Sequence, residues 1–193
     1  GQKKEFGKPS VPMKIEFGDD LATVTIDGTA QTLRVGEWSE FYELSFELNW
    51  LVKVDALTRV KLVQLEPFME LFVNVLDIDP AAPPFWQGVS TPFGFSAELA
   101  DACGPYETYG WSTATMAFED GEVDPELLME DVELTLKWRE GVTYSALGRD
   151  DLRLFMSVFS TTDRVQHMVY QFYDVDHPLH DPVAAAREIE FFG

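Results

Sequence analysis

The chain has 193 residues, of which 46% are hydrophobic and 13% aromatic, so a packed core is expected and wholesale disorder is excluded. The length suits one domain, or one domain and part of another. The 34 acidic and 14 basic residues give a formal net charge of -20. This charge repels nucleic acid and anionic membrane surfaces, so neither is expected as a partner.

The single cysteine, Cys103, excludes an internal disulfide and a thiolate metal cluster, and a small buried side chain is its expected role. No apolar run approaches the roughly 20 residues of a membrane-spanning helix, and the first residues lack the apolar centre of a signal peptide. We therefore expect a soluble, cytoplasmic chain. Its first residues also suit a flexible terminus or a cut inside a longer protein.

Residues 11–80 show β-like patterns. Short strands are predicted at 14–17, 21–27 and 31–35, and Asp27-Gly28 predicts a hairpin turn because both residues tolerate positive φ angles. Further strands are predicted within 41–55, 58–66 and 69–77. In 58–66 the polar residues Arg59, Lys61 and Gln64 interrupt the apolar ones, which predicts an antiparallel strand with one face in water.

A proline-rich stretch from Asp79 to Pro92 is the best internal boundary, because proline resists both ladders and helices. It divides a β-rich region, 11–80, from residues 81–193, where helical patterns dominate. Residues 94–104 predict a short helix capped by Ser96, and residues 108–123 are interpreted as a loop. Asp124-Pro125 predicts the start of a long amphipathic helix that runs toward Gly148, and Asp181-Pro182 precedes another.

The nearly unbroken apolar run Leu152–Phe159 predicts a strand buried on both faces. Ser160-Thr161-Thr162 follows it as a helix cap, and a helix follows in turn. A helix, a buried strand and another helix predict an α/β segment, so that the fold is α+β overall. The apolar stripe of this last helix consists of Val165, Met168, Val169 and Phe172.

Asp163 and His167 lie four residues apart, on another face of the same predicted helix. A carboxylate and a neutral imidazole are normal ligands of Zn²⁺ or Mn²⁺, and this spacing lets both reach one ion. The plainer alternative is an acidic residue that favours the helix dipole, followed by a surface or core histidine. The spacing alone leaves both open.

Two other groups of residues are weaker candidates. One cluster near the end of the chain could bind metal, but its prolines favour a structural loop; it comprises Asp174, Asp176, His177, His180 and Asp181. Trp38 and Trp86 could stack on a ligand, although core packing is the commoner fate of a tryptophan in a β-rich segment. No complete catalytic motif is present in the sequence.

The run FSTTDRVQHMVYQFYDVDHPLHDP resembles the F-S-x-x-D-R-x-Q-H-x-F-W…D-x-x-H-P-x-Y-D-P signature of predicted phosphohydrolases or phosphomutases in the alkaline phosphatase superfamily. Their branch is that of type I phosphodiesterases and nucleotide pyrophosphatases. VGEWSEFYELSF, MELFVNVLDIDPAAPPF and DGEVDPELLMEDV also look like segments of that family. The resemblance extends from about Val35 to Pro182. Val169-Tyr170 stands where the family commonly has Phe-Trp.

The resemblance implies a nucleophilic Ser or Thr and two metal ions, Zn or Mn, that together cleave small phosphate esters. Asp163 and His167 would be two ligands of one ion. The family's nucleophile segment and its Asp-His-Gly are not found in this sequence. The resemblance therefore implies a piece of a larger enzyme, inactive alone, that combines part of an alkaline-phosphatase-like α/β sheet (81–193) with a β-rich insertion (11–80). The alternative is a non-catalytic β-rich binding or interaction module.

Overall fold

The computed structural model describes residues 9–108 and 113–192, which contain both strands and helices. The expected α+β class is confirmed. The chain divides between residues 110 and 111 into two compact units, a β-rich unit and a helical unit. The expected division into an inserted region and a catalytic segment stays a prediction.

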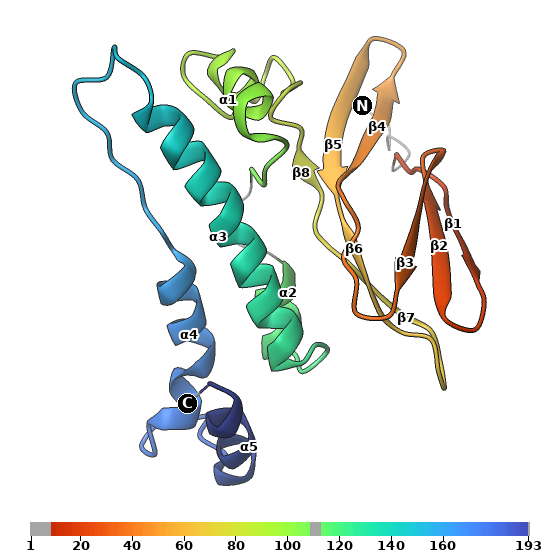
Figure 1. The fold of residues 1–193 in the computed structure, drawn as a ribbon, viewed down its shortest axis with the longest axis vertical. Helices are drawn as coiled ribbons and strands as arrows, with labels where there is room; N and C mark the ends of the chain where they lie inside the picture. The colour runs from red at the N-terminus through yellow and green to blue at the C-terminus, as the bar shows by residue number, and fades with distance from the viewer. Residues whose placement is uncertain (1–8, 109–112, 193) are drawn as a thin grey trace, which may run out of the picture. The chain divides into compact units, whose positions relative to one another are not determined.

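The β-rich unit contains three small antiparallel sheets in its described part (Figure 1). The first has the order β1-β2-β3, from Met13–Phe17, Leu21–Ile26 and Thr29–Arg34. The second has the order β4-β5-β8, from Tyr42–Asn49, Val52–Thr58 and Asp77–Ile78. The third pairs β6 (Val60–Gln64) with β7 (Glu70–Val73), and one helix, α1 (Phe95–Cys103), follows.

The turn between β2 and β3 is the predicted one. Asp27 and Gly28 both have positive φ, 48° and 84°, which twists the two strands in the sense that a tight hairpin needs. The core beside this hairpin includes fully buried Val24, Tyr42 and Leu62. The Tyr42 hydroxyl donates a hydrogen bond to the Val24 carbonyl (2.9 Å), so the one polar atom of that side chain is satisfied inside the core.

The prediction that 58–66 has a wet face is wrong. Arg59 and Lys61 are only 4% and 6% exposed. Arg59 is buried because Glu107 supplies a carboxylate 2.6 Å from its guanidinium nitrogen Nη2. The centroid of the Trp38 ring lies 5.0 Å from the guanidinium carbon Cζ. A paired charge with a cation–π partner can be buried where an isolated one cannot.

Three consecutive residues after α1 anchor the chain back onto this unit. The Tyr106 hydroxyl donates to the Ser96 carbonyl (3.2 Å), Glu107 binds Arg59, and the Thr108 amide donates to Asp77 Oδ1 (2.8 Å). Burial raises the pKa of Tyr106 to about 12, so this hydroxyl stays a proton donor.

The two ends of α1 differ from each other in how well they were predicted. Ser96 is buried and is not the helix cap, which is Gly94. Gly104 ends α1 as expected, with φ of 83°.

The helical unit contains α2 (Thr113–Glu119), α3 (Pro125–Leu147), α4 (Thr161–Tyr173) and α5 (Pro182–Phe192). The predicted start of α3 is confirmed, because Asp124 Oδ1 accepts a hydrogen bond from the Leu127 amide (2.8 Å). The helix predicted after Asp181-Pro182 is also confirmed. The interpretation of residues 108–123 as a loop is wrong where α2 forms; residues 109–112 lie outside the described part.

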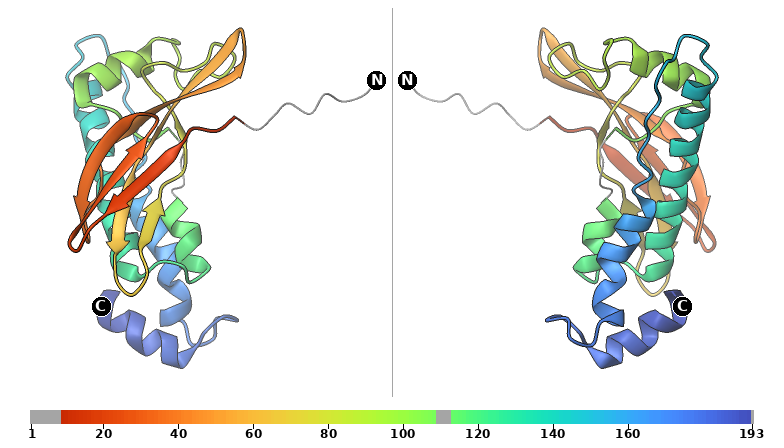
Figure 2. Two further views of the ribbon diagram at one scale, coloured as in Figure 1. Left: turned by 90° about the vertical axis from the view of Figure 1, so that its right-hand side faces the viewer. Right: turned by 90° about the vertical axis from the view of Figure 1, so that its left-hand side faces the viewer.

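The prediction of a buried strand at Leu152–Phe159 is wrong. The segment is extended but belongs to no sheet, and it runs back along α3 to the start of α4 (Figures 1 and 2). Leu154, Met156 and Val158 are 76%, 83% and 73% exposed. Among the residues that the structure describes, none forms a backbone hydrogen bond with residues 152–159. The apolar run supplies strand propensity, but a strand also needs a neighbouring strand, and the described part of the helical unit contains none.

Met156→Lys is expected to change the free energy of unfolding by less than about 0.5 kcal/mol, because an exposed side chain loses no packing. Urea denaturation measures it. The matched comparison is Leu128→Ala, since Leu128 is fully buried in α3 and its truncation should cost about 2–5 kcal/mol. A loss at Met156 as large as the loss at Leu128 would contradict the exposed segment.

Candidate functional site

Asp163 and His167 lie on the exposed side of α4, one turn apart. Asp163 Oδ1 is 3.6 Å from His167 Nε2, and the two side chains are 67% and 61% exposed. The predicted stripe lies on the other side, with Val169 buried and its three partners half-buried. The sequence prediction that this carboxylate and this imidazole share a face apart from the stripe is therefore confirmed.

The pair has a geometry that suits one metal ion. Two ligand atoms of a tetrahedral Zn²⁺, each about 2.0–2.1 Å from the ion, lie about 3.3 Å apart. The observed 3.6 Å is close to this separation, and a carboxylate oxygen and an imidazole nitrogen are suitable donors. The same distance also suits an ion pair with a protonated histidine. Over the described residues, no group of three or more His, Cys, Asp and Glu side chains converges, so the pair supplies two ligands and not a complete site.

Arg164, the residue after Asp163, points into the helical unit and is 4% exposed. Its Nε donates to Thr115 Oγ1 of α2 (2.6 Å), and its Nη1 donates to Thr135 Oγ1 of α3 (3.3 Å). Its Nη2 forms an ion pair with Asp131 of α3, which is fully buried. We call Thr115, Asp131 and Thr135 the Arg164 socket.

The socket was not predicted from the sequence, although α3 carries a signal of it. Asp131 lies among Leu127, Leu128 and Val132 on the apolar face of the helix, where an acidic residue is out of place. Such a residue is tolerated only with a partner of opposite charge, which here comes from α4.

The acidic and histidine-rich cluster near the end of the chain forms a loop, as predicted. Its side chains bind local backbone: Asp174 Oδ1 accepts from the Asp176 amide (3.0 Å), and His177 Nδ1 accepts from the Leu179 amide (3.2 Å). Asp181 Oδ1 accepts from the Val183 amide (2.8 Å) at the start of α5. These bonds are those of turns and helix caps. At the start of α4, by contrast, Ser160 occupies the cap position without a side-chain capping bond.

The two tryptophans differ. Trp38 is half-buried, edge-on to Phe72 at 5.8 Å, so core packing is confirmed for it. Trp86 is 47% exposed and lies edge-on to Phe85, which is 83% exposed, so core packing is wrong for Trp86.

Cys103 is half-buried rather than buried. Its thiol donates a hydrogen bond to the Leu99 carbonyl (2.9 Å), and burial raises the pKa of the thiol.

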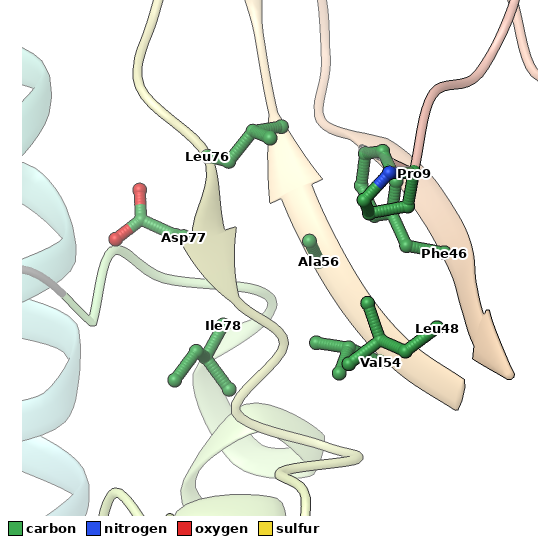
Figure 3. A pocket seen from close by; sticks show the side chains of 8 residues that line it. All are labelled: Pro9, Phe46, Leu48, Val54, Ala56, Leu76, Asp77 and Ile78. Carbon is green, nitrogen blue, oxygen red and sulfur yellow. The ribbon is translucent and has the colours of Figure 1, made fainter. Parts of the chain in front are cut away.

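An open apolar pocket of about 270 Å³ lies on the β4-β5-β8 sheet (Figure 3). Its lining is apolar except for Asp77, whose carboxylate points away from the pocket and accepts the Thr108 amide. The lining side chains belong to Pro9, Phe46, Leu48, Val54, Ala56, Leu76, Asp77 and Ile78. The pocket offers apolar contact and no polar group that would direct a reaction.

Comparisons of the chain with protein-family models, with curated proteins and with solved structures give no match. A search of the described helices for one with the length and apolar character needed to cross a membrane finds none. The fold and the site define an α+β protein that carries an exposed carboxylate–imidazole pair on one helix.

Proposed function

We propose that this chain is a segment of a metal-dependent phosphoric ester hydrolase similar to type I phosphodiesterases and nucleotide pyrophosphatases, and that Asp163 and His167 are two ligands of one of its two metal ions. The observation that carries the proposal is the exposed pair on α4, with its two donor atoms 3.6 Å apart. It coincides with the residues to which the sequence resemblance assigns metal binding. The same proposal takes small phosphate esters as the substrates, Zn²⁺ or Mn²⁺ as the metal ions and the cytoplasm as the location.

Each residue has a defined task in this proposal. Asp163 offers an anionic oxygen, and His167 must be neutral at Nε2 to offer a lone pair. A divalent ion, when bound, stabilises negative charge on phosphoryl oxygens and lowers the pKa of a bound hydroxyl. The nucleophile and the other ligands would come from further segments of the enzyme.

The extended segment Leu152–Phe159 supports the same proposal. Most of its side chains are apolar, yet most are exposed, and its backbone forms no hydrogen bond to another described backbone group. Such a segment is what a sheet strand presents when its neighbouring strands are elsewhere. In the proposed enzyme it would be a strand of the catalytic sheet, and it would lead directly into the ligand pair, as strands of α/β sheets lead into their sites.

The test is metal-dependent hydrolysis of a p-nitrophenyl phosphodiester. We expect no turnover by this chain alone, because two ligands do not complete a site. In the longer enzyme that the proposal implies, we expect turnover with Zn²⁺ or Mn²⁺ that falls to background in Asp163→Ala and His167→Ala. Gln166→Ala is the matched control, since residue 166 is exposed between the two. A longer enzyme whose activity is unchanged by Asp163→Ala would contradict the assignment.

The alternative function, a non-catalytic binding module, is favoured by one observation, the apolar pocket on β4, β5 and β8. In that case the pocket would bind an apolar ligand, and α4 would do no chemistry. Binding of an apolar fluorescent probe that is lost in Ala56→Trp, together with no metal binding at His167, would favour this alternative.

A further inference from the structure

We propose that Arg164 is a positioning residue for the ligand pair. Because it binds both α2 and α3, it sets the rotation of α4 at which Asp163 and His167 lie side by side and face solvent. This inference rests on the proposed function. It assigns to a buried side chain, which touches neither a metal nor a substrate, the task of orienting the residues that would.

Arg164 makes several contacts in different directions. The guanidinium of Arg164 donates to Thr115 of α2, to Thr135 of α3 and to Asp131 of α3 through three different nitrogens. The guanidinium is planar and rigid, so three bonds to two helices fix its plane as well as its position. The socket is itself held, because the Thr135 hydroxyl donates to the Asp131 carbonyl (2.9 Å).

The Arg164 contact restricts the rotation of α4 more than the apolar stripe of this helix does. Apolar contacts are not directional, and an apolar stripe can repack after a small rotation at modest cost. A buried ion pair has no such freedom, because any displacement leaves a charge without its partner in a dry site. Arg164 and Asp131 are 5% and 0% exposed at the side chain, so this penalty applies to both.

The rotation of α4 that the socket fixes also sets the positions of the ligand pair. Arg164 follows Asp163 directly and precedes His167 by three residues, in a helix with about 3.6 residues per turn. A rotation of α4 that moves Arg164 out of its socket moves both ligands by the same angle. Residues that orient metal ligands without touching the metal change metal affinity by about 10- to 100-fold in other proteins.

The experiment uses the whole chain and Mn²⁺ alone as the probe, read by paramagnetic broadening of backbone amide signals in NMR spectra. In the unmodified chain, the signals of Asp163 and His167 should broaden at the lowest Mn²⁺ concentration. Arg164→Lys keeps the charge but lacks the planar guanidinium. In this variant the Mn²⁺ concentration at which the broadening of these signals is half complete, the midpoint, should rise by about 10-fold or more. The matched control is Arg153→Lys, since Arg153 is exposed and the same chemical change there should leave the midpoint unaltered.

Thr115→Ala provides a milder variant, because it removes one acceptor and keeps the ion pair. We expect it to stay folded, as judged by circular dichroism, and to raise the midpoint in the same direction by a smaller factor. If Arg164→Lys does not fold, Thr115→Ala decides the question. An unchanged midpoint in the folded variants would overturn the positioning role and leave the proposed function standing. No selective broadening at Asp163 and His167 in the unmodified chain would overturn the positioning role, whereas the proposed function, in which further segments supply the remaining ligands, is tested by the hydrolysis assay.

Discussion

Asp131→Ala is expected to lower the free energy of unfolding of the helical unit by about 3–5 kcal/mol. Asp131 is fully buried, and its carboxylate neutralises the guanidinium of Arg164, which is also buried. Removing the carboxylate leaves a cation inside the protein without its counter-charge. Native-state amide hydrogen exchange of α3 measures the effect separately from the β-rich unit.

Two comparisons make this prediction specific. Glu133→Ala removes an exposed carboxylate from the same helix and should cost less than about 0.5 kcal/mol. The double variant Asp131→Ala/Arg164→Met should be less destabilised than the sum of its single variants, because it leaves no buried charge behind. A cost at Asp131 below about 1 kcal/mol would show that water or another group compensates for the missing carboxylate.

Glu107→Ala is expected to have an effect of similar size, about 3–5 kcal/mol, on the β-rich unit. The Glu107 carboxylate lies 2.6 Å from the Arg59 guanidinium, and the two side chains are 4% and 5% exposed. Asn74 Nδ2 also donates to the same carboxylate oxygen (3.4 Å), so the variant removes two buried contacts. Hydrogen exchange of the β6 amides measures the change.

The control for Glu107 is Glu16→Ala in β1 of the same unit. Glu16 is paired with Lys14 at 2.9 Å, but both side chains are more than half exposed, so water screens the pair. Its loss should cost about 0–1 kcal/mol. Equal effects at Glu16 and Glu107 would mean that the Arg59–Glu107 pair contributes no more than a surface pair does.

Features encoded by neighbouring residues were predictable from the sequence. Asp124 and Pro125 define the start of α3 through a capping oxygen and a fixed φ angle. Asp27 and Gly28 define the turn between β2 and β3 because both residues tolerate positive φ angles. The proximity of Asp163 and His167 also follows from helix geometry alone. Each of these features depends on residues within one turn of chain.

Features that depend on distant residues were missed. Arg59 was predicted to face water, because its burial is decided by Glu107, which is 48 positions away. The short helix α2 has no sequence signal of its own, yet its Thr115 binds Arg164, 49 positions away. The run Leu152–Phe159 has the composition of a buried strand, but composition cannot supply the neighbouring strands that burial requires.

The exposed run has a consequence for the behaviour of the protein in concentrated solution. From Leu154 to Phe159 it reads LFMSVF, six residues of high β propensity without charge, proline or glycine. Segments of this composition can stack between molecules into cross-β ladders, and here the backbone groups that such ladders use form no hydrogen bond to another described backbone group. The net charge of -20 opposes the approach of two molecules, and added salt weakens this repulsion. Colloidal stability thus rests on acidic residues that all lie outside the segment they protect.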